Sequence, residues 1–143
     1  MAGILIALLS GALMSIQGIF NTEVTKQTSI WVAAGWVQLS ALAVCFGAWL
    51  LTGRDSVGAL WRIDNKYALL GGIIGAFMTI TVIKGMDALG PARATMLIVI
   101  AQLGVSYLAE ILGWFGVEKQ PFEWRKLMGL AIAAAGIVVF KWE

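Results

Sequence analysis

The sequence contains no histidine, and its single cysteine, Cys45, lies inside an apolar stretch. A His/Cys metal site, a disulfide within the chain and a Ser-His or Cys-His nucleophile each need residues that are missing here. We therefore expect no metal site, no cofactor and no catalytic residue, and we expect that the protein is not an enzyme.

Charge is also scarce, because only 13% of the 143 residues are charged and 60% are hydrophobic. A soluble domain carries about 25% charged residues, so this composition is typical of a membrane protein. Ten Lys and Arg residues face eight Asp and Glu residues, and no basic run is present. We therefore expect no nucleic-acid partner.

The chain instead contains long apolar runs. Each run is long enough to cross a hydrocarbon core of about 30 Å when tilt and interfacial ends are allowed for. The connecting segments, of which Thr22 to Ser29 is the first, are too short for a soluble domain. The pattern predicts an all-α polytopic membrane protein, a single transmembrane domain over residues 1–143, with five transmembrane helices at 2–21, 30–51, 67–86, 92–114 and 126–141.

The fourth apolar segment carries polar residues on one face. On a helix, four of its side chains fall within an arc of about 80°. No charge lies between Arg93 and Glu110, which places Gln102 near the middle of the bilayer. A polar group in hydrocarbon needs a partner or water. We therefore expect a protein interior or a wet cavity beside Thr95, Gln102, Ser106 and Glu110.

Amides recur at membrane depth in two further segments. Gln17 and Asn21 lie one turn apart in the first segment, and Gln38 lies in the second. A shared central site for a small polar or amphiphilic substrate explains them economically, with Gln102 and Ser106 contributed by the fourth segment. The alternative is that these amides only join helices, through hydrogen bonds that contribute about 1 kcal/mol or less each.

Glu110 is the one carboxyl group on this polar face. An apolar setting favours the protonated form of a carboxyl group, so Glu110 is our candidate for coupling transport to a proton or for sensing the charge of a substrate. The alternative is that a carboxylate near the end of a span simply reaches the headgroups and water.

The distribution of positive charge favours one orientation only weakly. Five spans put the termini on opposite sides, and the positive-inside rule then favours a cytoplasmic amino terminus. Such a small excess permits insertion in both orientations and pairing of antiparallel copies, although many proteins of fixed orientation have small excesses too. The six residues on the amino-terminal side are Arg54, Arg62, Lys66, Lys119, Arg125 and Lys126, and the four on the other side are Lys26, Lys84, Arg93 and Lys141.

The second half of the chain resembles a known family. The turn LGPA at 89–92, the run LIVIAQLGVSYLAEILGWFG, Pro121 and the run RKLMGLAIAAAGIVV are similar to the carboxy-terminal half of the YdcZ-like family of the drug/metabolite transporter superfamily. Gln17 and Asn21 match the amide-bearing first helix of that family. Glu110 stands where the family leads us to expect an Asp, which keeps the charge.

The resemblance implies a small protein of the inner (plasma) membrane with an EamA/DMT-like half-unit of five helices. It further implies two units in opposite orientation, either a homodimer or a pair of homologous subunits, that move a small molecule by alternating access. Small multidrug exporters place a carboxylate in their first helix, where this chain has amides. The lipid bilayer is the other expected partner.

We therefore expect an inner-membrane transporter of a small polar or amphiphilic metabolite or drug. The alternative is a membrane subunit that packs against a partner protein and transports nothing.

Overall fold

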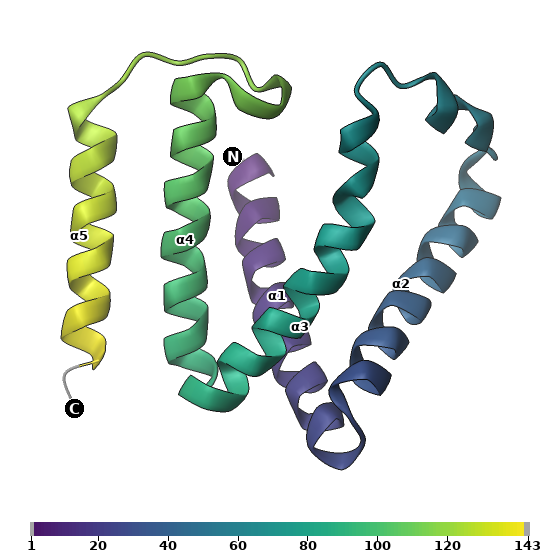
Figure 1. Cartoon of the computed structure of the whole chain (residues 1–143), viewed down its shortest axis with the longest axis horizontal. Coiled ribbons are helices and arrows are strands. Elements are labelled where there is room, and N and C mark those ends of the chain that lie inside the picture. The colour runs from purple at the N-terminus through teal and green to yellow at the C-terminus, as the bar shows by residue number, and fades with distance from the viewer. Residues whose placement is uncertain (1, 142–143) are drawn as a thin grey trace. The chain divides into compact units, whose positions relative to one another are not determined.

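The computed structural model describes residues 2–141, and within them every regular element is helical. This confirms the all-α prediction. The chain divides into two compact units, the first ending at Asp87 and the second beginning at Ala88. Residues 1, 142 and 143, which the predicted single domain includes, lie outside the described residues. The α-helices are α1 (Ala2–Gln27), α2 (Ile30–Thr52), α3 (Gly71–Leu89), α4 (Pro91–Leu112) and α5 (Trp124–Lys141) (Figure 1).

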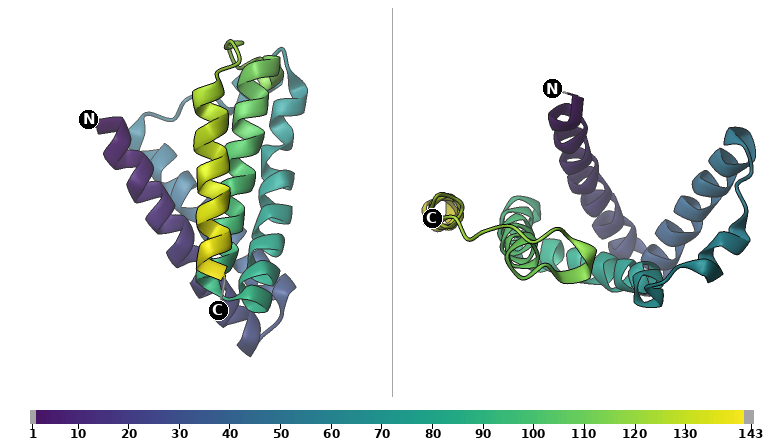
Figure 2. Two further views of the ribbon diagram at one scale, coloured as in Figure 1. Left: turned by 90° about the vertical axis from the view of Figure 1, so that its left-hand side faces the viewer. Right: turned by 90° about the horizontal axis from the view of Figure 1, so that it is seen from above.

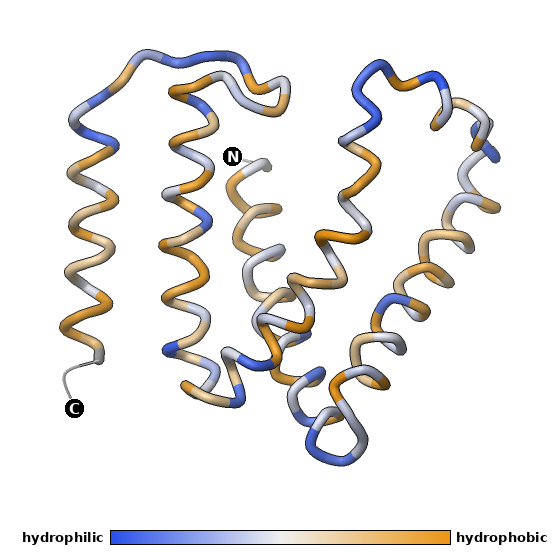
Figure 3. Tube along the Cα trace, viewed as in Figure 1, coloured by the Kyte–Doolittle hydropathy of each residue, from blue (hydrophilic) through white to orange (hydrophobic). Residues whose placement is uncertain are grey.

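Four helical segments in the described chain are long and apolar enough to cross a membrane: Ala2–Gln27, Ile30–Thr52, Lys66–Leu89 and Pro91–Leu112. Helix α5 is not among the four, and its 18 residues include Arg125, Lys126 and Lys141. A fifth membrane span therefore stays a prediction. Hydrophilic residues gather in the segments that join the helices, and hydrophobic residues dominate the helices themselves (Figure 3).

In the first unit, α1 packs closely against α3 at Gly18. Gly18 of α1 lies so close to α3 that a Cβ atom in its place would be 2.6 Å from Met86 Cε and 3.2 Å from Val82 Cγ1. The most buried side chains of this unit include Ala33 of α2 and Ile83 of α3, each of which is 1% exposed. The core of this unit is therefore small and lies near one end of α1.

Helix α1 runs further than the hydropathy pattern predicts, and the expected loop from Thr22 to Ser29 is wrong for most of its length. The hydroxyls of Thr22 and Thr25 each donate a hydrogen bond of 2.8 Å to the carbonyl four residues earlier. Glu23 and Lys26 form an ion pair of 3.6 Å one turn apart. An ion pair one turn apart favours a helix, and the turn to α2 is reduced to Thr28 and Ser29.

The short turn sets the geometry of α1 and α2. Ser29 caps α2, because its Oγ accepts a hydrogen bond of 3.3 Å from the amide of Val32. From this turn the two helices diverge as a V, which is seen best from above in the right-hand view of Figure 2. Two 3-10 helices, Val57–Arg62 and Lys66–Leu70, then lead to α3. The third span therefore begins as a 3-10 helix, and the α-helix starts only at Gly71.

The second unit is a hairpin of α4 and α5. Helix α4 begins at Pro91 and ends where Gly113 adopts a left-handed conformation with φ of 67°, two residues before the predicted end of the span. The loop that follows is tied back to α4 by Tyr107. Its hydroxyl donates to the carbonyl of Glu123 at 2.9 Å and accepts from the amide of Glu123 at 3.0 Å.

Apolar side chains also cover the outer faces of both units. Leu8 is 67% exposed, Leu42 is 65% exposed and Val139 is 76% exposed. Exposed apolar surface of this extent is unfavourable in water and suits lipid or another protein.

Candidate functional site

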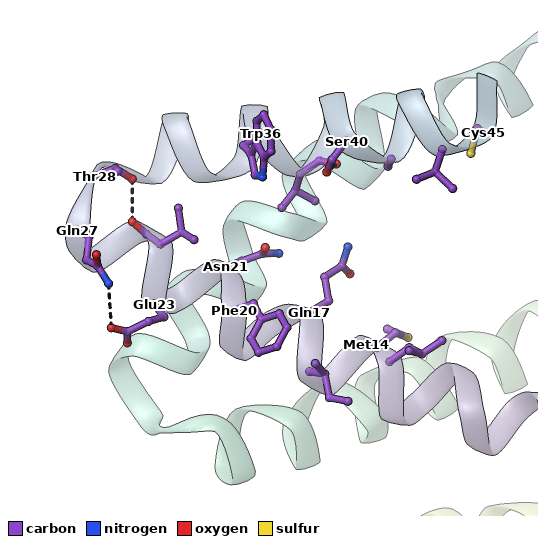
Figure 4. Close-up of a pocket in the computed structure, with 16 residues that line it drawn as sticks. Met14, Gln17, Phe20, Asn21, Glu23, Gln27, Thr28, Trp36, Ser40 and Cys45 are labelled. Carbon is purple, nitrogen blue, oxygen red and sulfur yellow. Dashed lines mark hydrogen bonds between the residues drawn. The ribbon is translucent and has the colours of Figure 1, made fainter. Parts of the chain in front are cut away.

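The largest cavity we describe is a cleft between α1 and α2, with a volume of about 990 Å³. We call it the α1–α2 cleft; it occupies the space inside the V (Figure 4). Its lining comes from α1 and α2 and the turn between them. The lining residues are Leu13, Met14, Ile16, Gln17, Phe20, Asn21, Glu23, Val24, Gln27, Thr28, Trp36, Val37, Ser40, Ala41, Val44 and Cys45.

Two of the predicted site residues, Gln17 and Asn21, meet in this cleft. Asn21 is only 8% exposed, and Gln17 points from α1 into the space between the helices (Figure 4). Among the residues drawn in Figure 4, neither side-chain amide is hydrogen-bonded to another residue. Both amides therefore keep donors and acceptors available to a molecule in the cleft.

The polar character of the cleft increases toward the turn. Glu23 accepts a hydrogen bond of 3.3 Å from Gln27 and forms the ion pair with Lys26. The carboxylate is thus matched by one ammonium group. Toward the open end the lining is apolar, with Leu13 and Met14 on α1 and Val44 on α2.

Gln38 has a partner outside this cleft. Its Nε2 donates a hydrogen bond of 3.3 Å to Thr79 Oγ1 on α3, and the Thr79 hydroxyl donates in turn to the carbonyl of Gly75. The structure therefore places Gln38 as a link between α2 and α3. The predicted grouping of Gln38 with Gln17 and Asn21 does not occur within this unit.

Ser106 and Glu110 line a second, smaller cavity of about 380 Å³ between α4 and α5. Glu110 Oε2 accepts from Lys126 Nζ at 3.3 Å, and both side chains are 41% exposed. The backbone carbonyl of Glu110 also accepts from the amide of Gln120 at 2.8 Å. Glu110 therefore binds both the loop and α5, where sequence reasoning left its partner open.

Gln102 lies on α4 with an exposed side chain, and it is absent from the lining of both cavities described above. The structure therefore brings together two pairs of the predicted residues, Gln17 with Asn21 and Ser106 with Glu110.

Sequence reasoning missed several residues that line the cavities. Trp36 and Ser40 line the α1–α2 cleft one helical turn apart, and with Val37, Ala41 and Val44 they form a stripe at helical spacing that the sequence displays. This stripe is the feature of the sequence from which the cleft-lining residues of α2 could have been predicted. Nothing in the sequence indicates Lys126, because its pairing with Glu110 depends on how the intervening loop folds.

Comparison with known proteins supports the resemblance. A family model described as "Putative inner membrane exporter, YdcZ" matches residues 2–139. The match covers nearly the whole chain and confirms the resemblance predicted from the sequence. No curated protein and no solved structure matches the chain.

Proposed function

The chain belongs to the YdcZ family, described as inner membrane exporters, and is a multi-pass inner-membrane protein; from this premise we propose that it exports a small polar or amphiphilic molecule. Export would proceed by alternating access in an antiparallel pair of chains. The rival role, a subunit that transports nothing, gains no support from the family match.

The observation that carries the proposal is the pair of free amides in the α1–α2 cleft. In the part of the chain that the structure describes, no side-chain polar atom is fully buried without a hydrogen-bond partner, so the amide of Asn21 is open to the cleft and can bind water or a ligand there. A volume of about 990 Å³ suits a molecule of drug size. A mostly apolar wall with a few polar groups is the usual composition of a small-molecule site.

Export can be tested before the substrate is identified. Cells that produce the protein are compared with cells that carry the empty vector, and small molecules in the medium are quantified by mass spectrometry. We expect at least one small molecule to accumulate outside the producing cells. An unchanged medium across several carbon sources, at verified levels of the protein in the membrane, would contradict the proposal.

The antiparallel pair predicts that the chain inserts both ways. Two reporters are fused after Glu143, one active only in the cytoplasm and one active only outside it. Six against four positive charges is a weak bias, so we expect substantial signal from both reporters. Adding two Lys residues to the loop between α2 and α3 should abolish the signal of one of the two reporters. Signal from a single reporter in the unmodified chain would exclude an antiparallel homodimer.

We assign Glu110 the role of the proton- or charge-sensing group of the transporter. Replacing Glu110 with Gln removes a group that can gain or lose a proton, and we expect the dependence of export on pH to flatten. Lys126→Gln is the matched control, because it breaks the same ion pair but keeps the carboxyl group. If Lys126→Gln flattens the pH response equally, the ion pair holds α4 to α5 and Glu110 has no separate coupling role.

A further inference from the structure

We propose that the α1–α2 cleft binds single-chain amphiphiles with an uncharged, hydrogen-bonding head. The head would lie on Gln17 and Asn21, and the apolar tail would extend toward the open end of the V. This inference rests on the proposed export function and narrows its substrate class.

The position of the head follows from the polar end of the cleft. Gln17 and Asn21 lie one turn apart on α1, and the hydroxyl-bearing Ser40 lines the cleft on α2. Amides and hydroxyls both donate and accept hydrogen bonds, so they match a head that carries hydroxyl or amide groups. Trp36, which also lines the cleft, offers an aromatic surface beside them.

The absence of a net charge on the head follows from the charges near the cleft. Glu23 is the one ionised side chain that lines it, and Lys26 lies 3.6 Å from the Glu23 carboxylate. Glu23 also accepts a hydrogen bond from Gln27. A cationic head would have to compete with Lys26, and an anionic head would meet the Glu23 carboxylate. An uncharged head meets neither cost.

The apolar tail of the ligand is inferred from the apolar end of the cleft. Leu13, Met14 and Val44 line it there, and Met is a flexible residue that adapts to ligands of different shape. The volume of about 990 Å³ lies at the upper end of the range for drug-sized ligands.

The chain contains its own reporter for this site. Cys45 is the single cysteine of the sequence, is exposed and lines the cleft. Its thiol can be labelled with N-ethylmaleimide in proteoliposomes of phosphatidylcholine. A matched control combines Cys45→Ala with Ala43→Cys, because residue 43 lies two residues away on the same helix and is exposed but does not line the cleft.

The probes share an octyl chain and differ in the head, and each is used below its micellar concentration. Octyl glucoside has an uncharged head, octyltrimethylammonium a cationic one and octyl sulfate an anionic one. We expect octyl glucoside to slow labelling of Cys45 by about fivefold at a concentration several times its dissociation constant. The charged probes should protect less, and Asn21→Leu should remove the protection.

Several results would overturn the proposal. Equal protection by all three probes would show that the cleft selects only for the tail, and equal protection of the Ala43→Cys control would show an effect on the bilayer. Cys45 that resists labelling before any probe is added would show that membrane lipid or a second copy fills the cleft. Labelling measures binding and does not depend on transport. If no probe protects Cys45 but the cells still export a molecule, the proposed head-and-tail site is wrong and the exporter function stands. Protection of Cys45 without any export would support the binding site and contradict the exporter function.

Discussion

Replacing Asn21 with Leu is expected to lower export by about tenfold or more while the protein remains in the membrane at its normal level. Leu has nearly the shape of Asn but cannot form hydrogen bonds. Asn21 is 8% exposed and lines the α1–α2 cleft, so the loss of its amide would remove the contact that we propose it makes to the substrate. The measurement is the accumulation of exported molecules in the medium, normalised to the amount of protein in the membrane.

Gln38→Leu is the matched control for Asn21→Leu. It also removes an amide from a membrane helix, but that amide is bonded to Thr79 and does not line the cleft. We expect Gln38→Leu to retain most of the export and to lower thermal stability slightly, since such hydrogen bonds contribute about 1 kcal/mol or less. If Gln38→Leu abolishes export and Asn21→Leu does not, the substrate site lies elsewhere.

Replacing Gly18 with Leu is expected to destabilise the packing of α1 against α3 in the first unit. A Cβ atom at this position lies 2.6 Å from Met86 Cε and 2.7 Å from Met86 Sδ, and a Leu side chain extends further still. Met86 is 4% exposed and its neighbour Ile83 is 1% exposed, so Met86 has little room to move. Overpacking of this kind costs about 1–3 kcal/mol. We expect a large fall in the midpoint of thermal aggregation in detergent.

Gly11→Leu on the same helix supplies the control, because, apart from its chain neighbours and the nearby backbone of α1, no atom in the described chain lies within 4 Å of a Cβ placed there. Both substitutions remove a helical glycine and add the same apolar side chain. Met86→Ala should restore part of the stability of the Gly18→Leu protein by making room for the leucine. Equal behaviour of the two Leu variants would contradict the close crossing of α1 and α3 at Gly18.

The sequence predicts the helices well because long apolar runs depend only on hydropathy and local backbone preference. It fails at helix ends, where particular side chains decide. The ion pair of Glu23 and Lys26 supports α1 beyond its expected end, and Gly113 ends α4 by adopting a left-handed conformation. Residues of these types occur in loops as well, so composition alone does not distinguish the two outcomes.

The candidate site was predictable where one helix supplies both residues. Gln17 and Asn21 share a face because they lie four residues apart, and no tertiary information is needed. The partner of Gln38 depends instead on how α2 is rotated toward α3, and the partner of Glu110 depends on the path of the loop between α4 and α5. Neither the rotation of α2 nor the path of this loop can be predicted from the periodicity of the sequence.

Because α1 is packed against α3 at Gly18, a rigid rotation of α1 would turn about a pivot near its carboxy-terminal end. The buried residues of α1 are Gly18, Asn21 and Thr22, whereas nearly every residue before Gly18 is exposed. Ala2 lies about 24 Å from the pivot at a rise of 1.5 Å per residue, so a rotation of about 10° would move it by roughly 4 Å. The same rotation would move Asn21 by less than about 1 Å. The mouth of the V can therefore change its width while the two amides keep their positions.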